Sequence, residues 1–461
     1  MQKKYLSPEY LDAAQEYREM RKELNNILKK KKEPRTDAEA ERIEELKKEM
    51  GKNAKLQNDL LKQHFTAISS KILSGKFRFK LTPDSSNDPQ KPLYVIGDSP
   101  EEYFAMQVLC RNVKKLFRIS MSGRDEILSQ LKMLLKEDKH RSYIIRTDVK
   151  LCFENIPHDK LFGYLEDNSL LDVKSKSLLR GLIRNEFEAK NLRPVVKSPR
   201  TGVPRGCAIS SLLAEYYLSK IDEELKRRFP ETIFLGRYVD DMVLIIHPDI
   251  SEANHKTVDE YVKEISELYK ENGLTIHTKS DGTDKCYTYD SKGSKGMDFN
   301  LLGYNIVKGN KKEDKLVFSL SQKKKDKITD RLKKTFATFK KLIDIIGYDG
   351  AAHYLFDALH VLTCNINLYN AKKGVKVGVY YSNQLLDNMD DLSLLDSQLA
   401  DCIEAIDLST ATTISVADCR SVQDKLVKKL VLLSFTKGFS APHKRYKISK
   451  DRLKMIKNSW A

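Results

Sequence analysis

The sequence lacks the cysteine spacing that marks a zinc site or a disulfide framework. Its seven cysteines are odd in number, widely scattered and never arranged as Cys-x-x-Cys. We therefore expect neither disulfides nor a zinc site, and predict that most of the cysteines are small buried side chains in a reducing compartment. They are Cys110, Cys152, Cys207, Cys286, Cys364, Cys402 and Cys419.

Long apolar segments are missing as well. No run reaches the roughly 20 apolar residues that span a bilayer, and the lysine-bearing start MQKKYLSPEY lacks the apolar core of a signal peptide. No internal repeat is evident. These absences predict a cytoplasmic protein without a membrane partner.

The charge of the chain is strongly one-sided. Its 461 residues carry a formal net charge of +17 and are 40% hydrophobic. This apolar content suffices for a globular chain of roughly two to four subdomains. The excess positive charge repels itself, and a polyanion would relieve that repulsion through screening and counterion release. Nucleic acid is therefore the first candidate partner.

Residues 1–66 are predicted to form a helical N-terminal extension. They are dense in Glu, Lys, Leu and Ala, with a break at the run KKKKEP. After the break, Thr36 and Glu39 have the spacing of a capping box, which starts a helix. The segment thus reads as a helical hairpin. Its alternating charges indicate an exposed face without chemistry, although the lysines could contact a phosphate backbone.

Residues 67–310 are predicted to form an α+β region. Short apolar runs such as YIIRTDV and IFLGRYVDDMVLIIH alternate with helical segments, which is typical of a sheet covered by helices. The first part mixes aromatic and basic side chains, a combination that suits nucleic-acid contact. These side chains are Lys71, Lys76, Phe77, Arg78, Phe79, Lys80, Tyr94, Tyr103 and Phe104.

Residues 311–346 are predicted to contain a basic helix with one packing face and one positive face. Its apolar residues fall at helical spacing, with lysines around the remaining circumference. The apolar positions are Ile328, Leu332, Phe336, Phe339, Ile343 and Ile346. In residues 347–461 helical patterns dominate, and no catalytic motif is recognisable.

The segment Tyr238-Val239-Asp240-Asp241 lies between two apolar runs. Its carboxylates should therefore project from the tight turn of a β-hairpin. Two adjacent acids need compensation, and oxygen ligands favour a hard divalent cation such as Mg²⁺. An Asp-Asp pair alone is weak evidence, because such pairs are common in ordinary turns.

Asp148 supplies a third acid in a matching context, at the end of the apolar run YIIRTDV. If the two strands are neighbours, Asp148 and Asp240 could bind two ions about 3.5–4 Å apart, the arrangement used in phosphoryl transfer. Phe153 follows where the chain leaves this site. Its ring could press against the sugar of an incoming nucleotide and exclude a 2′-hydroxyl there, or Phe153 could simply be a core residue.

The segment GVPRGCAISS, residues 202–211, leads into a helix. Glycines around a proline allow close approach of backbone to a ligand, and Ser210 is a plausible N-cap. The segment is either an ordinary loop before a helix or, with the acidic strands, a floor for the nucleotide base and template.

These segments, in this order, resemble the reverse transcriptases over about residues 124–304. IIRTDVKLCFENI is similar to their motif A, GVPRGCAISSLLAEYYL to motif B, YVDD to motif C and ENGLTIHTKS to motif D. FNLLGYNI is similar to the hydrophobic segment that supports the primer. The resemblance implies a right-hand polymerase with fingers, an RRM-like palm built on an antiparallel sheet, and a thumb formed by the basic helix.

The resemblance also implies roles for individual residues. Catalysis would fall to the three aspartates, with two Mg²⁺ ions, or Mn²⁺ as substitute, bound by Asp148, Val149, Asp240 and Asp241. Nucleotide contacts would come from Phe153, Arg124, Arg205, Gly206 and Lys279. Nucleic-acid contacts would come from Tyr238, Leu302, Gly303, Tyr304, Lys323, Lys324, Lys327 and Lys334. The partners implied are an RNA template, dNTPs and a DNA product.

The subtype that the sequence resembles most is the bacterial abortive-infection and defence-associated group. Arg205 replaces the glutamine of the common Pro-Gln-Gly, and Ser210-Ser211 replaces Ser-Pro. The resemblance to this group implies that the chain acts in antiphage defence and has an α-helical C-terminal region. It also implies a structured non-coding RNA as template and a homo-oligomeric enzyme. Some members of this group prime on a protein hydroxyl, for which Tyr380, Tyr381 and Tyr446 are candidates.

Two further readings stay open. One is an RNA polymerase or a template-independent or protein-primed terminal polymerase with the same palm. The other is a nucleic-acid-binding module with an inactive palm.

Overall fold

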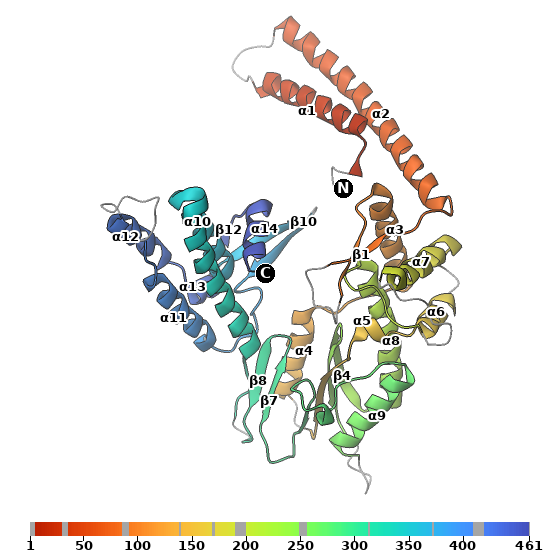
Figure 1. Cartoon of the computed structure of the whole chain (residues 1–461), viewed down its shortest axis with the longest axis vertical. Helices are drawn as coiled ribbons and strands as arrows, with labels where there is room; N and C mark the ends of the chain where they lie inside the picture. Colours follow the sequence, from red (N-terminus) through yellow and green to blue (C-terminus); the bar gives the residue numbers. More distant parts are fainter. Residues whose placement is uncertain are drawn as a thin grey trace. The chain divides into compact units, whose positions relative to one another are not determined.

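The computed structural model describes residues 5–29, 36–84, 92–137, 140–167, 171–189, 200–248, 256–311, 314–370, 373–408 and 419–460. The chain divides into two compact units (Figure 1). The first comprises Met1–Ser122, Thr147–Met242 and Asp259–Cys286. The second comprises Gly123–Arg146, Val243–Val258 and Tyr287–Ala461.

The first unit begins with a helical hairpin, as the sequence predicted. It consists of α1 (Pro8–Lys29) and α2 (Asp37–Leu73). The capping box at Thr36 and Glu39 is present. Polar contacts join the two helices, including an ion pair of 2.9 Å between Arg42 and Glu23. The second helix continues to Leu73, beyond the expected end at residue 66.

A short antiparallel pair follows the hairpin. It is formed by β1 (Leu81–Pro83) and β2 (Tyr94–Ile96), with Thr82 opposite Val95. The next helix, α3 (Pro100–Leu116), starts with a capping box of Ser99 and Glu102. The Glu102 carboxylate is 5% exposed and also accepts a hydrogen bond from Lys80 N at 2.8 Å. Glu102 thus ties the segment before β1 to the start of α3.

The central elements alternate between strands and helices. They are β3 (Tyr143–Asp148), α5 (Cys152–Asn155), α6 (His158–Asp167), α7 (Val173–Ala189), α8 (Ala208–Arg228), β4 (Thr232–Tyr238), β5 (Asp241–Ile246), α9 (Val258–Glu271), the 3₁₀ turn η2 (Lys279–Asp281) and β6 (Tyr287–Asp290).

The four central strands form one sheet in the order β4-β5-β3-β6. The β3–β6 pair is antiparallel, with Tyr143 opposite Asp290. Strand β5 occupies an inner position, and its residues from Met242 to Ile246 are each 0% exposed. This burial accounts for the uninterrupted apolar run MVLII in the sequence. The sheet makes β3 and β5, which carry the predicted acids, direct neighbours.

The second unit contains another antiparallel sheet and a long helix. The sheet, in the order β7-β8-β9, comprises β7 (Met297–Leu301), β8 (Tyr304–Lys308) and β9 (Val317–Leu320). This unit also contains α4 (Arg124–Glu137) and α10 (Gln322–Thr363). Helix α10 includes the predicted basic helix and is interrupted at Gly347, where φ is +76°.

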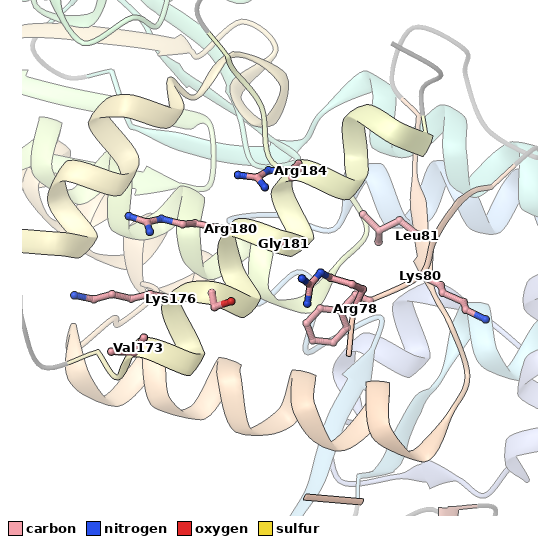
Figure 2. A pocket seen from close by; sticks show the side chains of 10 residues that line it. Arg78, Lys80, Leu81, Val173, Lys176, Arg180, Gly181 and Arg184 are labelled. Atoms are coloured by element: carbon pink, nitrogen blue, oxygen red, sulfur yellow. The ribbon is translucent and has the colours of Figure 1, made fainter. Parts of the chain in front are cut away.

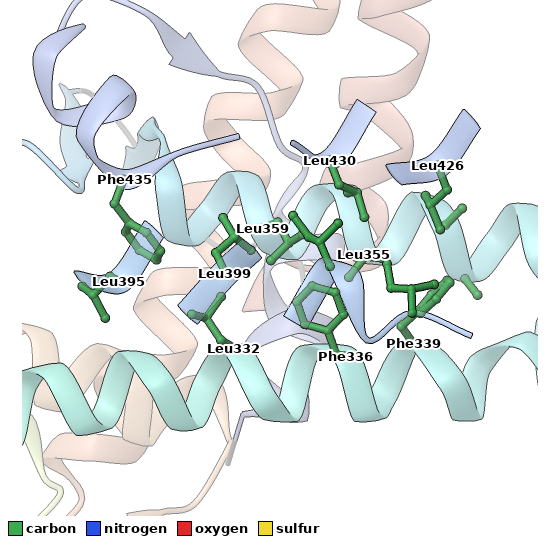
Figure 3. Close-up of a cluster of buried hydrophobic side chains, with 14 of the residues drawn as sticks. Leu332, Phe336, Phe339, Leu355, Leu359, Leu395, Leu399, Leu426, Leu430 and Phe435 are labelled. Carbon is green, nitrogen blue, oxygen red and sulfur yellow. The ribbon is translucent and has the colours of Figure 1, made fainter. Parts of the chain in front are cut away.

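The predicted apolar stripe of α10 builds the main core of the second unit (Figure 3). Leu332, Phe336 and Phe339 are buried there against leucines of the helices that follow. Ile346, the last predicted member, is 51% exposed. The break at the next residue, Gly347, ends the regular face on which the stripe lay.

The C-terminal region mixes helices with a small sheet. The helices are α11 (Asp390–Glu404), α12 (Cys419–Leu430), α13 (Phe435–Ser440) and α14 (Lys450–Ser459). The sheet, in the order β11-β10-β12, comprises β11 (Lys373–Gly378), β10 (Asn365–Asn370) and β12 (Arg445–Tyr446). The sequence analysis expected helices here and missed these strands, because NINLYN and KGVKVG show only a short apolar–polar alternation between longer helical patterns. Within the described ranges, no helix is both long and apolar enough to cross a bilayer.

Candidate active site

The motif at residues 238–241 forms the tight hairpin turn that the sequence predicted. Strand β4 ends at Tyr238 and β5 begins at Asp241. Val239 adopts a left-handed conformation with φ of +60°, which is uncommon for a β-branched residue. The turn is therefore strained and needs support from its surroundings.

Arg237 supplies that support. Its guanidinium donates to the Val239 carbonyl at 3.0 Å, to both oxygens of Glu215 at 2.9 Å and to Asp222 at 2.8 Å. Burial opposes the charge of Arg237, but Asp222 and Glu215 outweigh it and hold the pKa of Arg237 above its ordinary value. Because both acids lie on α8, this ion cluster fixes the turn to the helix that follows residue 207.

Asp148 lies directly beside the turn. The backbone N–H of Val149 donates to the Asp240 carbonyl at 3.0 Å. On the other side, His277 N donates to the Asp148 carbonyl at 3.0 Å, and the Thr147 hydroxyl donates to the His277 carbonyl at 2.6 Å. The structure thus brings the predicted acids together at one end of β3 and β5.

The Asp148 carboxylate has two basic neighbours, and one of its oxygens accepts no hydrogen bond. Lys285 Nζ donates to Oδ2 at 2.8 Å, while Oδ1 is buried without a hydrogen-bond partner. His277 Nε2 lies 3.5 Å from Oδ1. Burial lowers the pKa of His277 although Asp148 acts in the opposite direction. A buried, unsatisfied carboxylate oxygen is costly and calls for a cation.

The residues present fit a divalent cation. Asp148, Asp240 and Asp241 offer carboxylates and Val149 offers a carbonyl, all hard oxygen ligands suited to Mg²⁺. Within the described part of the chain, no group of three or more His, Cys, Asp or Glu side chains is placed so that it could hold a metal ion by itself. Mg²⁺ is commonly held by one or two carboxylates together with substrate phosphates, so an incomplete protein cage is compatible with such a site.

Phe153 and Arg205 contact each other beside this site. The Arg205 guanidinium lies 5.6 Å from the centre of the Phe153 ring and 3.5 Å from a Glu154 oxygen. Val203 N donates to the Phe153 carbonyl at 2.7 Å. The loop at residues 202–207 is therefore docked on the chain that follows Asp148.

Gly206 allows a close backbone approach, but the partner is protein. Its φ is +94°, and a Cβ here would lie 2.7 Å from the Tyr94 carbonyl oxygen of β2. Tyr94 N in turn donates to the Arg205 carbonyl at 2.7 Å. The glycine thus lets strand β2 contact the loop, whereas the sequence suggested approach to a ligand.

Two lysines near the end of the first unit have carboxylate partners. Lys279 Nζ donates to Asp259 of α9 at 2.7 Å, and both side chains are more than half exposed. Lys285, which no sequence pattern singled out, contacts Asp148 instead. Tyr238, at the end of β4, is 40% exposed and so offers a ring at the edge of the turn.

In the second unit, Leu302 and Gly303 form the turn between β7 and β8, both with positive φ. Arg124 donates to the carbonyls of Leu302 at 2.7 Å and Ser382 at 3.2 Å. Tyr304 is 0% exposed, with Arg124 5.0 Å from its ring centre. Arg124 and Tyr304, expected at the nucleotide and the nucleic acid, support the turn from inside.

The predicted lysines of α10 differ in exposure. Lys323 and Lys327 are exposed. Lys324 donates to the Ser382 carbonyl at 3.0 Å, and burial, followed by the nearby Arg124, lowers the pKa of Lys324 to about 7. Lys334 donates to the Trp460 carbonyl at 3.1 Å. Lys324 and Lys334 are thus engaged within the protein.

The three tyrosines considered for priming also have protein contacts. Tyr381 donates its hydroxyl to the Pro442 carbonyl at 3.2 Å. Tyr446 donates to Asp357, and burial together with this carboxylate raises the pKa of Tyr446 to about 12. Tyr380 packs against Tyr381, with ring centres 5.3 Å apart.

Sequence reasoning missed Arg237, Glu215, Asp222, His277 and Lys285. Arg237 could have been found, because a charged residue within an apolar strand directly before the acids is unusual. Lys285 and His277 left no signal, since only folding brings them to Asp148.

The sheet order places acids at the ends of two neighbouring strands, which is the arrangement that the resemblance to a polymerase palm predicted. Residues 103–306 match the family described as "Reverse transcriptase (RNA-dependent DNA polymerase)". Residues 103–306 are therefore similar to a reverse transcriptase domain, and the matched segment includes Asp148, Asp240, Asp241 and the residues described above as their contacts.

Two curated proteins are similar to parts of the chain. A segment of 181 residues is 30% identical to "Uncharacterized 91 kDa protein in cob intron" of Schizosaccharomyces pombe and covers 37% of this chain and 22% of that protein. A segment of 95 residues is 28% identical to "Putative COX1/OXI3 intron 2 protein" of Saccharomyces cerevisiae and covers 21% and 11%. The chain thus matches less than a quarter of the length of either relative.

Solved polymerase structures show only weak similarity. An apo telomerase from Candida tropicalis, truncated from the C-terminal domain, has a TM-score of 0.34 at 16% identity, covering 52% of this chain and 54% of the other. A structure described as "RdRp complex" has a TM-score of 0.35 at 10% identity, covering 87% and 44%.

Proposed function

We propose that the protein is an RNA-directed DNA polymerase that joins deoxynucleotides to a primer with the help of two Mg²⁺ ions. The observation that supports this most is the buried, unpartnered Oδ1 of Asp148 beside the Asp240-Asp241 turn. The bound ions would activate the primer hydroxyl and neutralise the triphosphate. The chain itself would orient the three carboxylates through Arg237 and the backbone bonds of β3.

The test is primer extension on an RNA template by the Asp240→Asn, Asp241→Asn double variant. We expect loss of incorporation, with RNA binding retained. A matched control is Asp59→Asn with Glu267→Gln, which removes two exposed acids from α2 and α9 and should leave extension unchanged. Undiminished synthesis by the active-site variant would overturn the proposal.

Template and priming are part of the same proposal. RNA serves as template, and Phe153 selects deoxynucleotides. A template-independent, protein-primed or RNA-synthesising enzyme with the same palm would instead extend without added RNA, become covalently linked to its product, or use ribonucleotides. An inactive palm would bind nucleic acid without any metal-dependent turnover. Supplying single nucleotides with and without added RNA separates these outcomes.

For the biological role, we favour antiphage defence in the bacterial cytoplasm, with a structured non-coding RNA as template and a homo-oligomeric enzyme. The support is the sequence of residues 202–211, with Arg205 and Ser210-Ser211, and a large C-terminal region after α10. A role connected with introns is the second candidate, because both curated relatives are named for introns.

Sequencing of the RNA and DNA that co-purify with the protein decides between these roles. One abundant structured RNA with complementary DNA is the result expected for defence. Recovery of intron RNA would favour the second candidate, and a mixture of bulk cellular RNA without cognate DNA would contradict both.

A further inference from the structure

A strongly basic cleft lies on the first unit, between α7 and the segment that leads into β1 (Figure 2). Its volume is about 730 Å³, within the range of roughly 300–1,000 Å³ that is usual for ligand sites. Cations line both of its sides. They are Arg78, Lys80, Lys176, Arg180 and Arg184.

The cations of α7 recur at every fourth residue. Lys176, Arg180 and Arg184 leave successive turns of the helix, and Arg78 lies beside Gly181 (Figure 2). Like charges four residues apart repel each other along a helix. Of the three, only Arg180 pairs with a carboxylate of the described residues, that of Glu166. The arrangement destabilises the free helix and would be relieved by an anion.

On the opposite side of the cleft, one cation is held in place by the protein. The Arg78 guanidinium donates to the carbonyls of Gly75 and Phe77, both at 2.9 Å. The backbone N–H of Lys80 donates to the Glu102 carboxylate at 2.8 Å, while the Lys80 side chain is exposed. A guanidinium held as that of Arg78 is loses little conformational entropy when it binds a phosphate.

The floor and rim of the cleft contain apolar side chains. Phe79 is 2% exposed and forms part of the floor, while Val173 is 85% exposed at the rim. A smaller cavity of about 230 Å³ adjoins α7 and is also lined by Arg180 and Arg184, together with Arg200. The basic surface is therefore larger than the contact area of a single phosphate. It suits a polynucleotide strand, whose phosphates would contact the cations while its bases contact the apolar side chains.

We infer that this cleft binds the phosphodiester backbone of an RNA strand, at a site whose lining includes none of the candidate active-site residues. An extended run of cations recognises phosphates without reading sequence. The choice of RNA rests on the proposed function. The cleft would hold template or companion RNA independently of the metal-binding acids.

The test uses the full chain with Lys176→Gln and Arg184→Gln. These two cations have no carboxylate partner among the described residues, and glutamine has a helix propensity close to that of Lys and Arg. The matched control is Lys263→Gln with Lys270→Gln, which removes two exposed cations from α9 of the same unit. Binding of an unstructured single-stranded RNA is measured against salt concentration, without metal or nucleotides.

We expect the cleft variant to bind RNA more weakly than the control. The slope of log K against log salt should fall by about 1.4, or about 0.7 for each lost phosphate contact. Extension of a hairpin primer with a very short template overhang should stay at the wild-type rate. An unchanged slope and affinity would overturn the inference.

Photocrosslinking of the wild-type chain to thiouridine-containing RNA gives a second readout, which does not depend on a variant that folds. Crosslinked peptides from α7 support the inference, and crosslinks confined to other elements contradict it. Because these assays need no catalysis, a failure of the proposed polymerase activity would show separately, as absent extension by a protein that still binds RNA.

Discussion

The two carboxylate oxygens of Asp148 differ in their surroundings: one contacts a lysine, and the other accepts no hydrogen bond and is suited to bind a cation. Lys285 contacts Oδ2, whereas Oδ1 remains buried without a partner. The nearby Cys152 thiol is not a competing metal ligand. Its burial, followed by the charge of Asp240, raises the pKa of the thiol to about 12. The thiol therefore stays neutral and acts as a small core residue.

We predict that Lys285→Gln slows nucleotide incorporation by about tenfold or more, because it removes the cation that contacts the Asp148 carboxylate, which we propose to be catalytic. Lys270→Gln is the matched control, because it removes an exposed lysine from α9 of the same unit. Single-turnover primer extension measures both. Equal effects of the two substitutions would contradict the placement of Lys285.

We predict that Phe153→Ala increases the use of ribonucleotides relative to deoxynucleotides by about tenfold or more, because loss of the ring removes the barrier to a 2′-hydroxyl. The Arg205 contact on the ring indicates that its position is fixed. The readout is the ratio of kcat/KM for a ribonucleotide and its deoxy counterpart. If the ratio is unchanged, Phe153 is only a packing residue.

The three aspartates could be predicted at the scale of residues because the strands that carry them are local patterns. The partners of the aspartates could not. Arg237 and Lys285 act through contacts with residues that lie elsewhere in the sequence. Tyr304 was expected to contact nucleic acid because FNLLGYNI is similar to the segment that supports the primer, but its burial beneath Arg124 arises only from tertiary packing.

At the scale of elements, the glycine at position 206 joins strand β2 to the loop before α8. We predict that Gly206→Ala lowers the thermal unfolding midpoint for two reasons. The new Cβ would lie only 2.7 Å from the Tyr94 carbonyl oxygen, and the positive φ would cost alanine about 1–3 kcal/mol of backbone strain. Gly75→Ala is the control, since Gly75 also has positive φ but open space around it. Equal losses would show that the approach to Tyr94 is unimportant.

The start of α10 contains a lysine with a lowered pKa. Burial lowers the pKa of Lys324 to about 7, so between pH of about 7 and about 10 the unfolded chain binds a proton there that the folded chain does not. Stability should therefore rise with pH in this window, by about 1.4 kcal/mol per pH unit from this group.

We predict that Lys324→Met removes this contribution, so that stability increases less steeply with pH than in the wild type. Lys323→Met, at an exposed neighbouring position, should leave the slope unchanged. Denaturation by urea at a series of pH values measures it. A wild-type slope in Lys324→Met would contradict the lowered pKa.

Elements with strong local signals could be predicted. The capping box of α2, the hairpin at Asp240 and the apolar stripe of α10 are all present. The strands β10 and β11 were missed because they are held mainly by pairing with each other and with β12. The break at Gly347 follows from its positive φ. A glycine allows this conformation, but its presence in the sequence does not predict a helix break.

At the scale of the whole molecule, the net charge of +17 predicted a polyanionic partner but not where it binds. The structure divides that charge between cations engaged within the protein, such as Arg237, and cations that line the cleft beside α7. Composition cannot distinguish these two groups, because the difference arises only from tertiary contacts.

The central claim is that Asp148, together with Asp240 and Asp241, catalyses DNA synthesis on RNA. The most direct test is deoxynucleotide incorporation on a primed RNA template by the wild type and by Asp148→Asn, at equal RNA occupancy and in the presence of Mg²⁺. The wild type should extend the primer and the variant should be slower by about 100-fold or more. Equal extension by the two proteins would contradict the account.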